Sequence, residues 1–273
     1  YFHEDFKVDS FKLYQASQLN HLLTQEYTYL PLYKRLDKIK RVLQQQVKSH
    51  KDVMLKKIIA HYDVKMEKGL NFKGAEEKRK AYISEVLKRK DLRLNHIKAE
   101  MRTAATRYMK SIKKHDTFTH YKQLFTSPER LCDYAQGMLS ETDAADLCTY
   151  SQKIFAKKKY EAEDVGPLLY LHAKLYGIQP GQKAKNVVID EAQDYSFMQL
   201  QALKTAVDTD MFTLVGDLAQ GIHSYRGLQT WEEVHHRIFP RATYTELQKS
   251  YRTTVEIMKQ ANRILQLLTY DFP

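Results

Sequence analysis

Two adjacent carboxylates, Asp190 and Glu191, stand directly after the apolar run 187–189. A carboxylate at the mouth of a buried strand costs free energy unless a counter-charge is present, and Mg²⁺ with a nucleotide phosphate supplies one. A second carboxylate beside it can orient or deprotonate an attacking water. The pair therefore indicates metal-assisted phosphate chemistry, with capping of the following turn as the alternative.

A second apolar run of the same kind, residues 211–215, ends in Gly216-Asp217. Residues 197–207 between the two runs have a helical pattern, and Ser196 is placed to cap that helix. Strand, helix and strand with short links predict a crossover unit of an α/β domain with two neighbouring parallel strands. Ligands bind beyond the carboxyl ends of such strands, so we expect residues 190–191 and 216–217 to lie side by side.

The lysine-bearing phosphate loop G-x-x-x-x-G-K-[ST] does not occur in the 273 residues. Residues 216–221 have the glycine spacing but continue into Ile222-His223-Ser224 without the lysine. The chain opens on Tyr1 and stops at Pro273 in mid-pattern. We therefore expect a fragment of a longer polypeptide, and a degenerate relative that does not hydrolyse nucleotide is the alternative.

The basic charge lies in the first part of the chain. Residues 1–160 hold 33 Lys and Arg against 19 Asp and Glu, whereas residues 161–273 hold 11 against 14. Residues 31–115 alone carry a net charge of +16, from 25 basic and 9 acidic residues. This asymmetry predicts two parts with different partners.

The basic part has the apolar spacing of helices. Apolar residues recur at three- and four-residue steps from Leu32 to Ile58 and again from Ile83 to Ile112. Gly69 and Gly74 between them are suited to breaking a helix. Two helices of about 30 residues would form an antiparallel arm roughly 45 Å long. Only three glycines and two prolines occur in residues 1–160, so little is expected to interrupt helix there.

Further helices are expected up to Gly177. Ser127 and Pro128 have the residue types of an N-cap and a first helical position. Cys132 and Cys148 are too few for a disulfide framework or a metal knuckle and indicate reduced thiols. No apolar run reaches the ~18 residues of a membrane span, and no signal-peptide pattern is present. These features predict a cytoplasmic protein without a membrane partner.

Three stretches resemble, in order, motifs of superfamily 1 helicases of the UvrD/Rep type. Residues 187–194 (VVIDEAQD) resemble motif II, residues 214–227 (LVGDLAQGIHSYRG) resemble motif III, and residues 247–254 (LQKSYRTT) resemble motif IV. The wording DEAQDYS, the apolar run 165–171 ahead of it and the long basic helical stretch are most similar to the HelD branch. Those proteins are helicase-like ATPases that bind bacterial RNA polymerase.

The resemblance implies an α/β fold: part of a RecA-like P-loop NTPase parallel sheet, with a large, mainly α-helical insertion that contains the antiparallel arm. Residues 1–165 would be the insertion and accessory subdomain with the basic arm. Residues 166–241 would be the later part of the first RecA-like domain, with motifs II and III. Residues 242–273 would begin the second RecA-like domain with motif IV.

The resemblance also implies roles for individual residues and ATP with Mg²⁺ as cofactors. Asp190 would hold Mg²⁺, and Glu191 would activate the hydrolytic water. Gln220 would sense the γ-phosphate, Tyr251 would stack on the adenine, and Arg252 would reach the γ-phosphate from the second domain. Simpler interpretations are a turn residue for Gln220, ordinary packing for Tyr251 and a surface position for Arg252.

Partner contacts are predicted at two places. Tyr225 matches the motif III aromatic that stacks on single-stranded DNA in the unwinding relatives, and packing is its equal alternative. Leu70 and Phe72 are apolar residues at the exposed end of the arm, which favours docking into a protein pocket over purely electrostatic binding. An arm whose lysines only keep it soluble is a third interpretation.

The sequence therefore favours a fragment of a helicase-like ATPase motor that remodels complexes of RNA polymerase with nucleic acid. A DNA helicase that unwinds duplex by base stacking and translocation is the second hypothesis. The third is a polymerase-binding module that acts sterically without hydrolysis.

Overall fold

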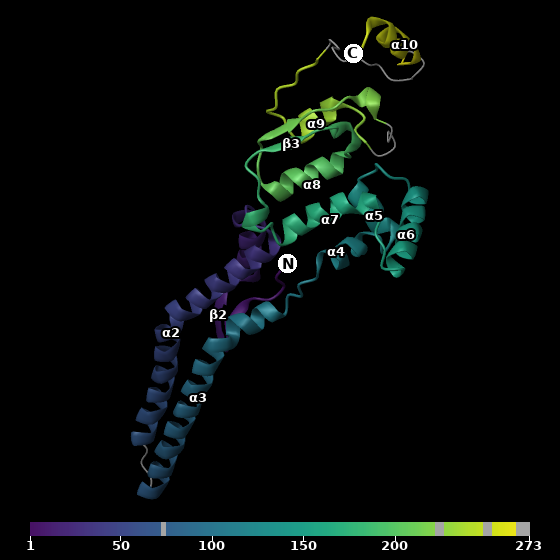
Figure 1. Cartoon of the computed structure of the whole chain (residues 1–273). Helices are drawn as coiled ribbons and strands as arrows, with labels where there is room; N and C mark the ends of the chain where they lie inside the picture. The colour runs from purple at the N-terminus through teal and green to yellow at the C-terminus, as the bar shows by residue number, and fades with distance from the viewer. Residues whose placement is uncertain (72–74, 222–226, 248–252, 266–273) are drawn as a thin grey trace. The chain divides into compact units, whose positions relative to one another are not determined.

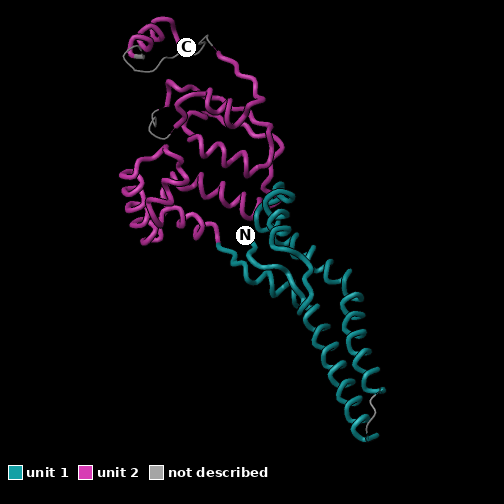
Figure 2. Tube along the Cα trace, turned by 180° about the vertical axis from the view of Figure 1, so that it is seen from behind, with its two compact units in different colours: residues 1–115 teal, residues 116–273 magenta. Residues whose placement is uncertain are grey.

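The computed structural model describes residues 1–71, 75–221, 227–247 and 253–265. It divides the chain into two compact units, residues 1–115 and 116–273 (Figure 2). The domain boundary expected at residue 165 from the family resemblance lies inside a helix of the second unit, α7 (Ala162–Leu175).

The first unit begins with a β-hairpin that the sequence pattern did not predict. Strands β1 (Phe6–Val8) and β2 (Phe11–Tyr14) pair antiparallel around Asp9, whose φ of 54° lies in the left-handed region. Phe6 is fully buried against the ring of Tyr108. The expectation of nearly uninterrupted helix over residues 1–160 is therefore wrong at its N-terminal end, because packing on a distant residue fixes these short strands.

Two long helices make up most of the first unit. After α1 (Ala16–His21) and the π-helical turn η1 (Leu22–Glu26), helix α2 (Leu32–Leu70) runs side by side with α3 (Glu76–Lys110) (Figure 1). The buried residues of α2 recur every three or four positions and form one apolar stripe: Tyr33, Leu36, Ile39, Leu43, Val47, Met54 and Ile58.

Helices α2 and α3 are 39 and 35 residues long, which is longer than expected from the sequence. Gly69 does not break α2, because the helix continues through it to Leu70. A Cβ built on Gly69 would lie 2.8 Å from the ring of Tyr82, so the glycine permits the close approach of α3. Gly74 lies outside the described residues.

The second unit begins with four helices: α4 (Thr117–Leu124), α5 (Pro128–Ala135), α6 (Glu141–Ala156) and α7. Ser127 caps α5 by accepting from the Arg130 amide, with Pro128 at its first position, as the sequence predicted. A core of Tyr121, Phe125, Cys148 and Phe155 holds these helices together. Helix α7 ends at Leu175 before Gly177, whose φ is 76°.

Strands β3 (Val187–Ile189) and β4 (Phe212–Leu214) form the parallel pair that the sequence predicted, joined through α8 (Phe197–Val207). The short turns η2 (Pro180–Gln182), η3 (Ala192–Asp194) and η4 (Leu218–Gln220) flank them. Helix α8 has Ser196 as its N-cap, in a capping box, and packs against α7.

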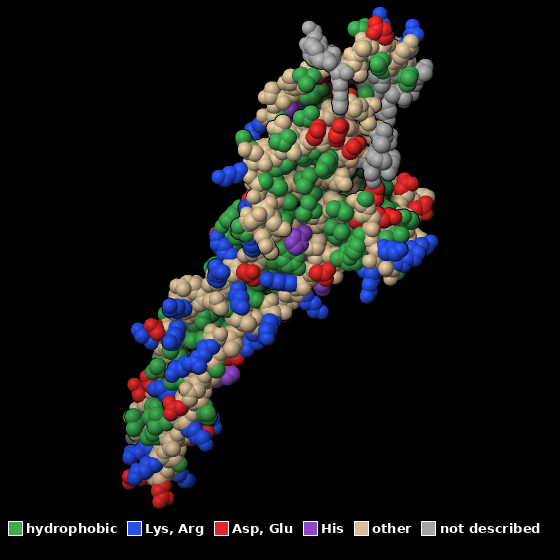
Figure 3. Space-filling view, in the orientation of Figure 1, with side chains coloured by type: hydrophobic (Ala, Val, Ile, Leu, Met, Phe, Trp, Pro, Cys, Tyr) green, Lys and Arg blue, Asp and Glu red, His purple; other side chains and the backbone are tan. Residues whose placement is uncertain are grey.

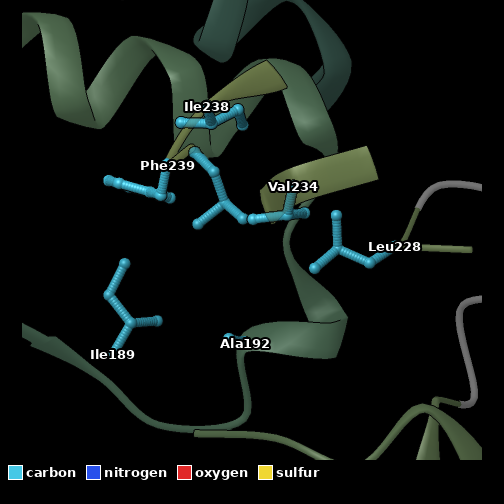
Figure 4. Packing of buried hydrophobic residues seen from close by; sticks show 7 residues of the cluster. Ile189, Ala192, Leu228, Val234, Ile238 and Phe239 are labelled. Carbon is cyan, nitrogen blue, oxygen red and sulfur yellow. The ribbon is translucent and has the colours of Figure 1, made fainter. Parts of the chain in front are cut away.

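Helix α9 (Trp231–Arg237) completes the core behind the strands (Figure 4). The buried members of this core are Ile189, Ala192, Leu200, Leu228, Val234, Ile238 and Phe239. Helix α10 (Val255–Leu265) is the last element described. The core fixes the C-terminal ends of β3 and β4, where the polar residues of interest begin.

Candidate functional site

The segments that follow β3 and β4 stay together beyond the strands. The Val215 amide donates to the Ile189 carbonyl at 2.9 Å, and the Ala192 amide donates to the Val215 carbonyl at 2.9 Å. These bonds extend the parallel ladder by a further step. Residues 190–191 and 216–217 therefore lie side by side, as expected from the sequence.

Glu191 adopts a backbone conformation that is uncommon for its residue type. Its φ and ψ are 50° and 42°, in the left-handed region, and this turn ends the strand and starts η3. The Glu191 amide donates to Oδ1 of Asp190 at 2.9 Å. Both side chains point to solvent rather than into the core. The sharp turn thus places two carboxylates at the strand end, where residues in sparsely populated conformations are often functional.

Gln193 connects this carboxylate pair to the segment after β4. It is 4% exposed, and its Nε2 donates to Oε2 of Glu191 at 2.7 Å. Its Oε1 accepts from the Asp217 amide at 3.0 Å, and its backbone carbonyl accepts from the Leu228 amide at 3.1 Å. Buried Gln193 thus holds the turn after β3, the segment after β4 and Leu228 in one arrangement.

Gly216 leaves the space that the Gln193 side chain occupies. A Cβ at residue 216 would lie 2.4 Å from Oε1 of Gln193, 3.0 Å from the Ala192 nitrogen and 3.1 Å from the Gln193 nitrogen. Any side chain at this position would displace the bridging amide. The sequence pattern placed Gly216 at the strand end but did not assign a role to Gln193. The signal for Gln193 was an amide within the polar run that follows the apolar run 187–189.

The Asp217 side chain organises the turn that carries Gln220. Oδ1 of Asp217 accepts from the Ala219 amide at 2.9 Å, and Oδ2 accepts from Nε2 of Gln220 at 2.8 Å. Hydrogen bonds thus run from Glu191 through Gln193 and Asp217 to Gln220. A change at one end of this chain of contacts has a direct physical route to the other end.

The donor set at the strand ends fits a magnesium ion. Oδ2 of Asp190 and Oε1 of Glu191 make no hydrogen bond or ion pair with any described residue. Carboxylate oxygens are the protein ligands that Mg²⁺ prefers, and Mg²⁺ commonly takes one or two of them with substrate phosphates and water. Within the described ranges, His, Cys, Asp and Glu side chains form no group of three or more that could hold a metal by themselves.

Four of the residues assigned roles from the sequence cannot be placed. Tyr225, Tyr251, Arg252 and Phe72 lie outside the described residues. Leu70 is the last residue of α2, and its side chain is 58% exposed. The structure therefore brings together Asp190, Glu191 and Gln220 only.

Cys132 and Cys148 are both free thiols, and burial raises the pKa of Cys148. In the part of the chain that the structure describes, each helix is too short or too polar for a transmembrane span.

Comparison with known proteins identifies one family. The model of the UvrD/REP helicase N-terminal domain matches residues 9–231, which is more than half of the chain. No solved structure matches the chain significantly.

Three curated relatives share segments with the chain. DNA helicase II of Escherichia coli is 32% identical over 149 residues, which are 54% of this chain and 18% of that protein. ATP-dependent DNA helicase PcrA of Bacillus subtilis is 23% identical over 158 residues, 55% of this chain and 21% of the relative. ATP-dependent DNA helicase Rep of Buchnera aphidicola is 35% identical over 86 residues, 30% of this chain and 13% of the relative. The matched segments thus span about a fifth of these relatives or less.

Proposed function

We propose, because this chain belongs to the UvrD/REP helicase N-terminal domain family, that it forms part of an ATP-hydrolysing, helicase-like motor. The observation that carries the proposal is the connection from Glu191 through buried Gln193 to Asp217 and Gln220 at the ends of two parallel strands. The matched relatives are several times longer than the matched segments. The phosphate-binding loop would be supplied by polypeptide outside the 273 residues.

Each site residue that the structure describes has a proposed role in ATP hydrolysis. Asp190 would hold Mg²⁺, directly or through water, and a bound ion would supply positive charge against the nucleotide phosphates. Glu191 accepts a proton from the attacking water, and Gln193 fixes the orientation of its carboxylate. Gln220 contacts the γ-phosphate. Loss of this phosphate then alters the hydrogen bond between Gln220 and Asp217 and changes the conformation of the turn after β4.

Residues of the second domain complete the proposed site. Tyr251 stacks on the adenine, and Arg252 binds the γ-phosphate through its planar guanidinium. Residues 1–165 then form the helical insertion and accessory subdomain. Residues 166–241 complete the first RecA-like domain, and residues 242–273 begin the second.

Substitution of Glu191 tests this proposal. In a form of the protein that includes the phosphate loop, Glu191→Gln should lower ATP turnover by at least about 100-fold, as loss of a general base does, while nucleotide binding persists. The matched control is Glu232→Gln, at an exposed position on α9, which should leave turnover unchanged. Retained turnover in Glu191→Gln would dismiss Glu191 as the base. The 273-residue chain alone should show no turnover above background.

Duplex DNA is one candidate substrate of the complete motor. The curated relatives are named as DNA helicases, and Tyr225 in motif III would stack on an unpaired base. A strand-separation assay with ATP tests this candidate. Tyr225→Ala should then reduce unwinding more than it reduces ATP turnover without DNA.

Remodelling of RNA polymerase–nucleic acid complexes, as in the HelD branch, is the second candidate. Lys and Arg side chains gather along the α2–α3 region (Figure 3), and residues 31–115 carry a net charge of +16. The region favours this candidate because α2 ends in the exposed apolar Leu70. Leu70 and Phe72 would insert into a pocket on the surface of RNA polymerase. A module that binds RNA polymerase and acts sterically without hydrolysis is the third candidate.

A paired substitution separates these candidates. Leu70→Ala with Phe72→Ala should weaken binding to RNA polymerase by tenfold or more, about 1.4 kcal/mol, with little change in DNA affinity. Leu92→Ala is the control, because Leu92 on α3 is also an exposed leucine, at 62%. Unchanged polymerase affinity alongside reduced DNA affinity would mean that Leu70 and Phe72 contact nucleic acid instead.

A further inference from the structure

The loop before α2 is held in one conformation by Arg35. The guanidinium of Arg35 donates to the carbonyls of Leu30 at 2.6 Å, Thr28 at 2.8 Å and Leu23 at 3.1 Å. The Leu30 amide also donates to the Tyr27 carbonyl at 3.0 Å. The loop follows the π-helical turn η1, a rare element that is frequent at functional sites. Three hydrogen bonds from one side chain thus hold this loop and η1 in one conformation.

This loop carries an exposed aromatic side chain, Tyr29. Tyr27 is 6% exposed and anchors the loop in the core, whereas Tyr29 is 68% exposed. The two rings meet edge to face with centroids 6.5 Å apart. A large aromatic side chain that stays exposed on a rigid loop has a free face for a planar ligand.

A cation sits beside this ring. The Lys38 ammonium donates to the Tyr29 hydroxyl and lies 4.2 Å from the centroid of Tyr27 and 5.2 Å from that of Tyr29. An ammonium has three donors, and the hydroxyl takes one of them. The hydrogen bond with Tyr29 raises the pKa of Lys38 above its usual range. Glu26 also acts on this lysine, so a polyanion needs further cations to bind here.

Those cations follow Lys38 along α2. Lys34, Lys38, Arg41 and Lys48 are spaced four, three and seven residues apart, which places them on one face of the helix. This face is turned away from the buried stripe of α2, which includes Leu36, Ile39 and Leu43. Lys34, Arg41 and Lys48 are exposed and form no ion pair with any described residue. The row spans about 21 Å at 1.5 Å per residue, the length of about six nucleotides of a strand that keeps the stacked rise of ~3.4 Å each.

We propose that Tyr29 and the row Lys34, Lys38, Arg41 and Lys48 form a binding site for single-stranded nucleic acid. The Tyr29 ring stacks on an unpaired base, and the phosphates of the same strand lie along the row of cations on α2. This pairing of an aromatic platform with a basic track is the chemistry of single-strand binding. An acidic polypeptide would use the charges but has no need of the exposed ring face. The site lies in the first unit and requires no nucleotide hydrolysis.

Substitutions at Tyr29 test the stacking half of the proposal. Binding of a fluorescent oligothymidylate to the 273-residue chain is measured by anisotropy without ATP. Tyr29→Ala and Tyr29→Leu should each weaken binding about fivefold or more, whereas Tyr29→Phe should stay within about twofold because it keeps the ring. Since Tyr29 is largely exposed, circular dichroism should show unchanged helix content in all three. Equal affinity of the leucine and phenylalanine variants would overturn the stacking role.

Salt dependence tests the row of cations against a control variant that removes the same charge elsewhere. Replacing Lys34, Arg41 and Lys48 together by Gln should reduce the slope of log affinity against log salt by about two units, at ~0.7 per phosphate contact. The control replaces exposed Lys78, Lys88 and Lys98 of α3 by Gln, which removes the same charge and should leave the slope unchanged. An equal loss in both triple variants would mean diffuse attraction and would refute the track.

Two further probes identify the ligand class. Blunt duplex DNA should bind less tightly than the single strand and should be insensitive to Tyr29→Ala. Polyglutamate of matched charge should compete poorly, and equal competition would assign the site to acidic polypeptides instead. The Tyr29→Ala effect should persist in a Tyr225→Ala background, because independent sites contribute additively. Failure of the ATPase proposal would leave all of these measurements unaffected.

Discussion

Gly216→Ala should destabilise the second unit through one identifiable contact. The added Cβ would lie 2.4 Å from Oε1 of Gln193, well inside van der Waals contact, and about 3 Å from two backbone nitrogens. The Gln193 amide can retreat only by giving up its bonds to Glu191 and the Asp217 amide. Overpacking of this kind costs ~1–3 kcal/mol, and a lost bond to a charged group costs ~1.5–3 kcal/mol. Movement of the Gln193 amide relieves the overpacking but breaks its hydrogen bonds, so the two costs do not add in full. We expect a total destabilisation of about 2–4 kcal/mol.

Urea denaturation followed by tryptophan fluorescence measures this cost directly. Trp231 is the only tryptophan in the chain and packs against the core behind β3, so its emission reports the unit that contains Gly216. The control is Gly181→Ala, since a Cβ at Gly181 meets nothing within 4 Å and should change stability by less than ~0.5 kcal/mol.

A double-mutant cycle with Gln193→Ala isolates the contact. Gln193→Ala removes the amide that the new Cβ meets, so Gly216→Ala should cost about 1–2 kcal/mol less in that background than in the native chain. The same cost in both backgrounds would show that the backbone contacts dominate. A native-background cost equal to that of Gly181→Ala would refute the packing argument altogether.

Three further outcomes are expected. Gly69→Ala should destabilise the first unit by no more than ~2 kcal/mol, because its Cβ would meet the Tyr82 ring at 2.8 Å while alanine gains ~1 kcal/mol of helix propensity, and thermal melting of the helix signal would show it. Tyr121→Phe should cost about 1–2 kcal/mol in urea denaturation, because the buried Tyr121 hydroxyl donates to Asp164 at 2.7 Å. Burial, with Asp5 and Glu4 nearby, raises the pKa of Tyr108 to about 12. Its neutral form is favoured by folding, so this contribution to stability is complete below about pH 10 and is lost as the pH rises towards 12, which Tyr108→Phe should abolish in alkaline unfolding.

The local elements of this protein were predictable because their signals lie within a few residues of one another. Ser127 and Ser196 cap the helices that their sequence contexts indicate, since an N-cap bonds to an amide three residues away. The apolar runs at 187–189 and 212–214 form parallel strands for the same reason of local composition. The expected burial on both faces is wrong for β3, because Val188 is 73% exposed. The order of three short motifs in the sequence likewise sufficed to indicate the UvrD/Rep type.

Other features depend on residues far apart in the chain, and the tertiary structure alone decided them. The hairpin at residues 6–14 forms where Phe6 meets Tyr108, and Gly69 lies within a helix because Tyr82 approaches it. Gln193 acquires its role only when the Asp217 amide, 24 residues further on, comes to its side-chain oxygen. Periodicity and capping are written in short windows of sequence, whereas such contacts arise only after the chain has closed long loops around a common core.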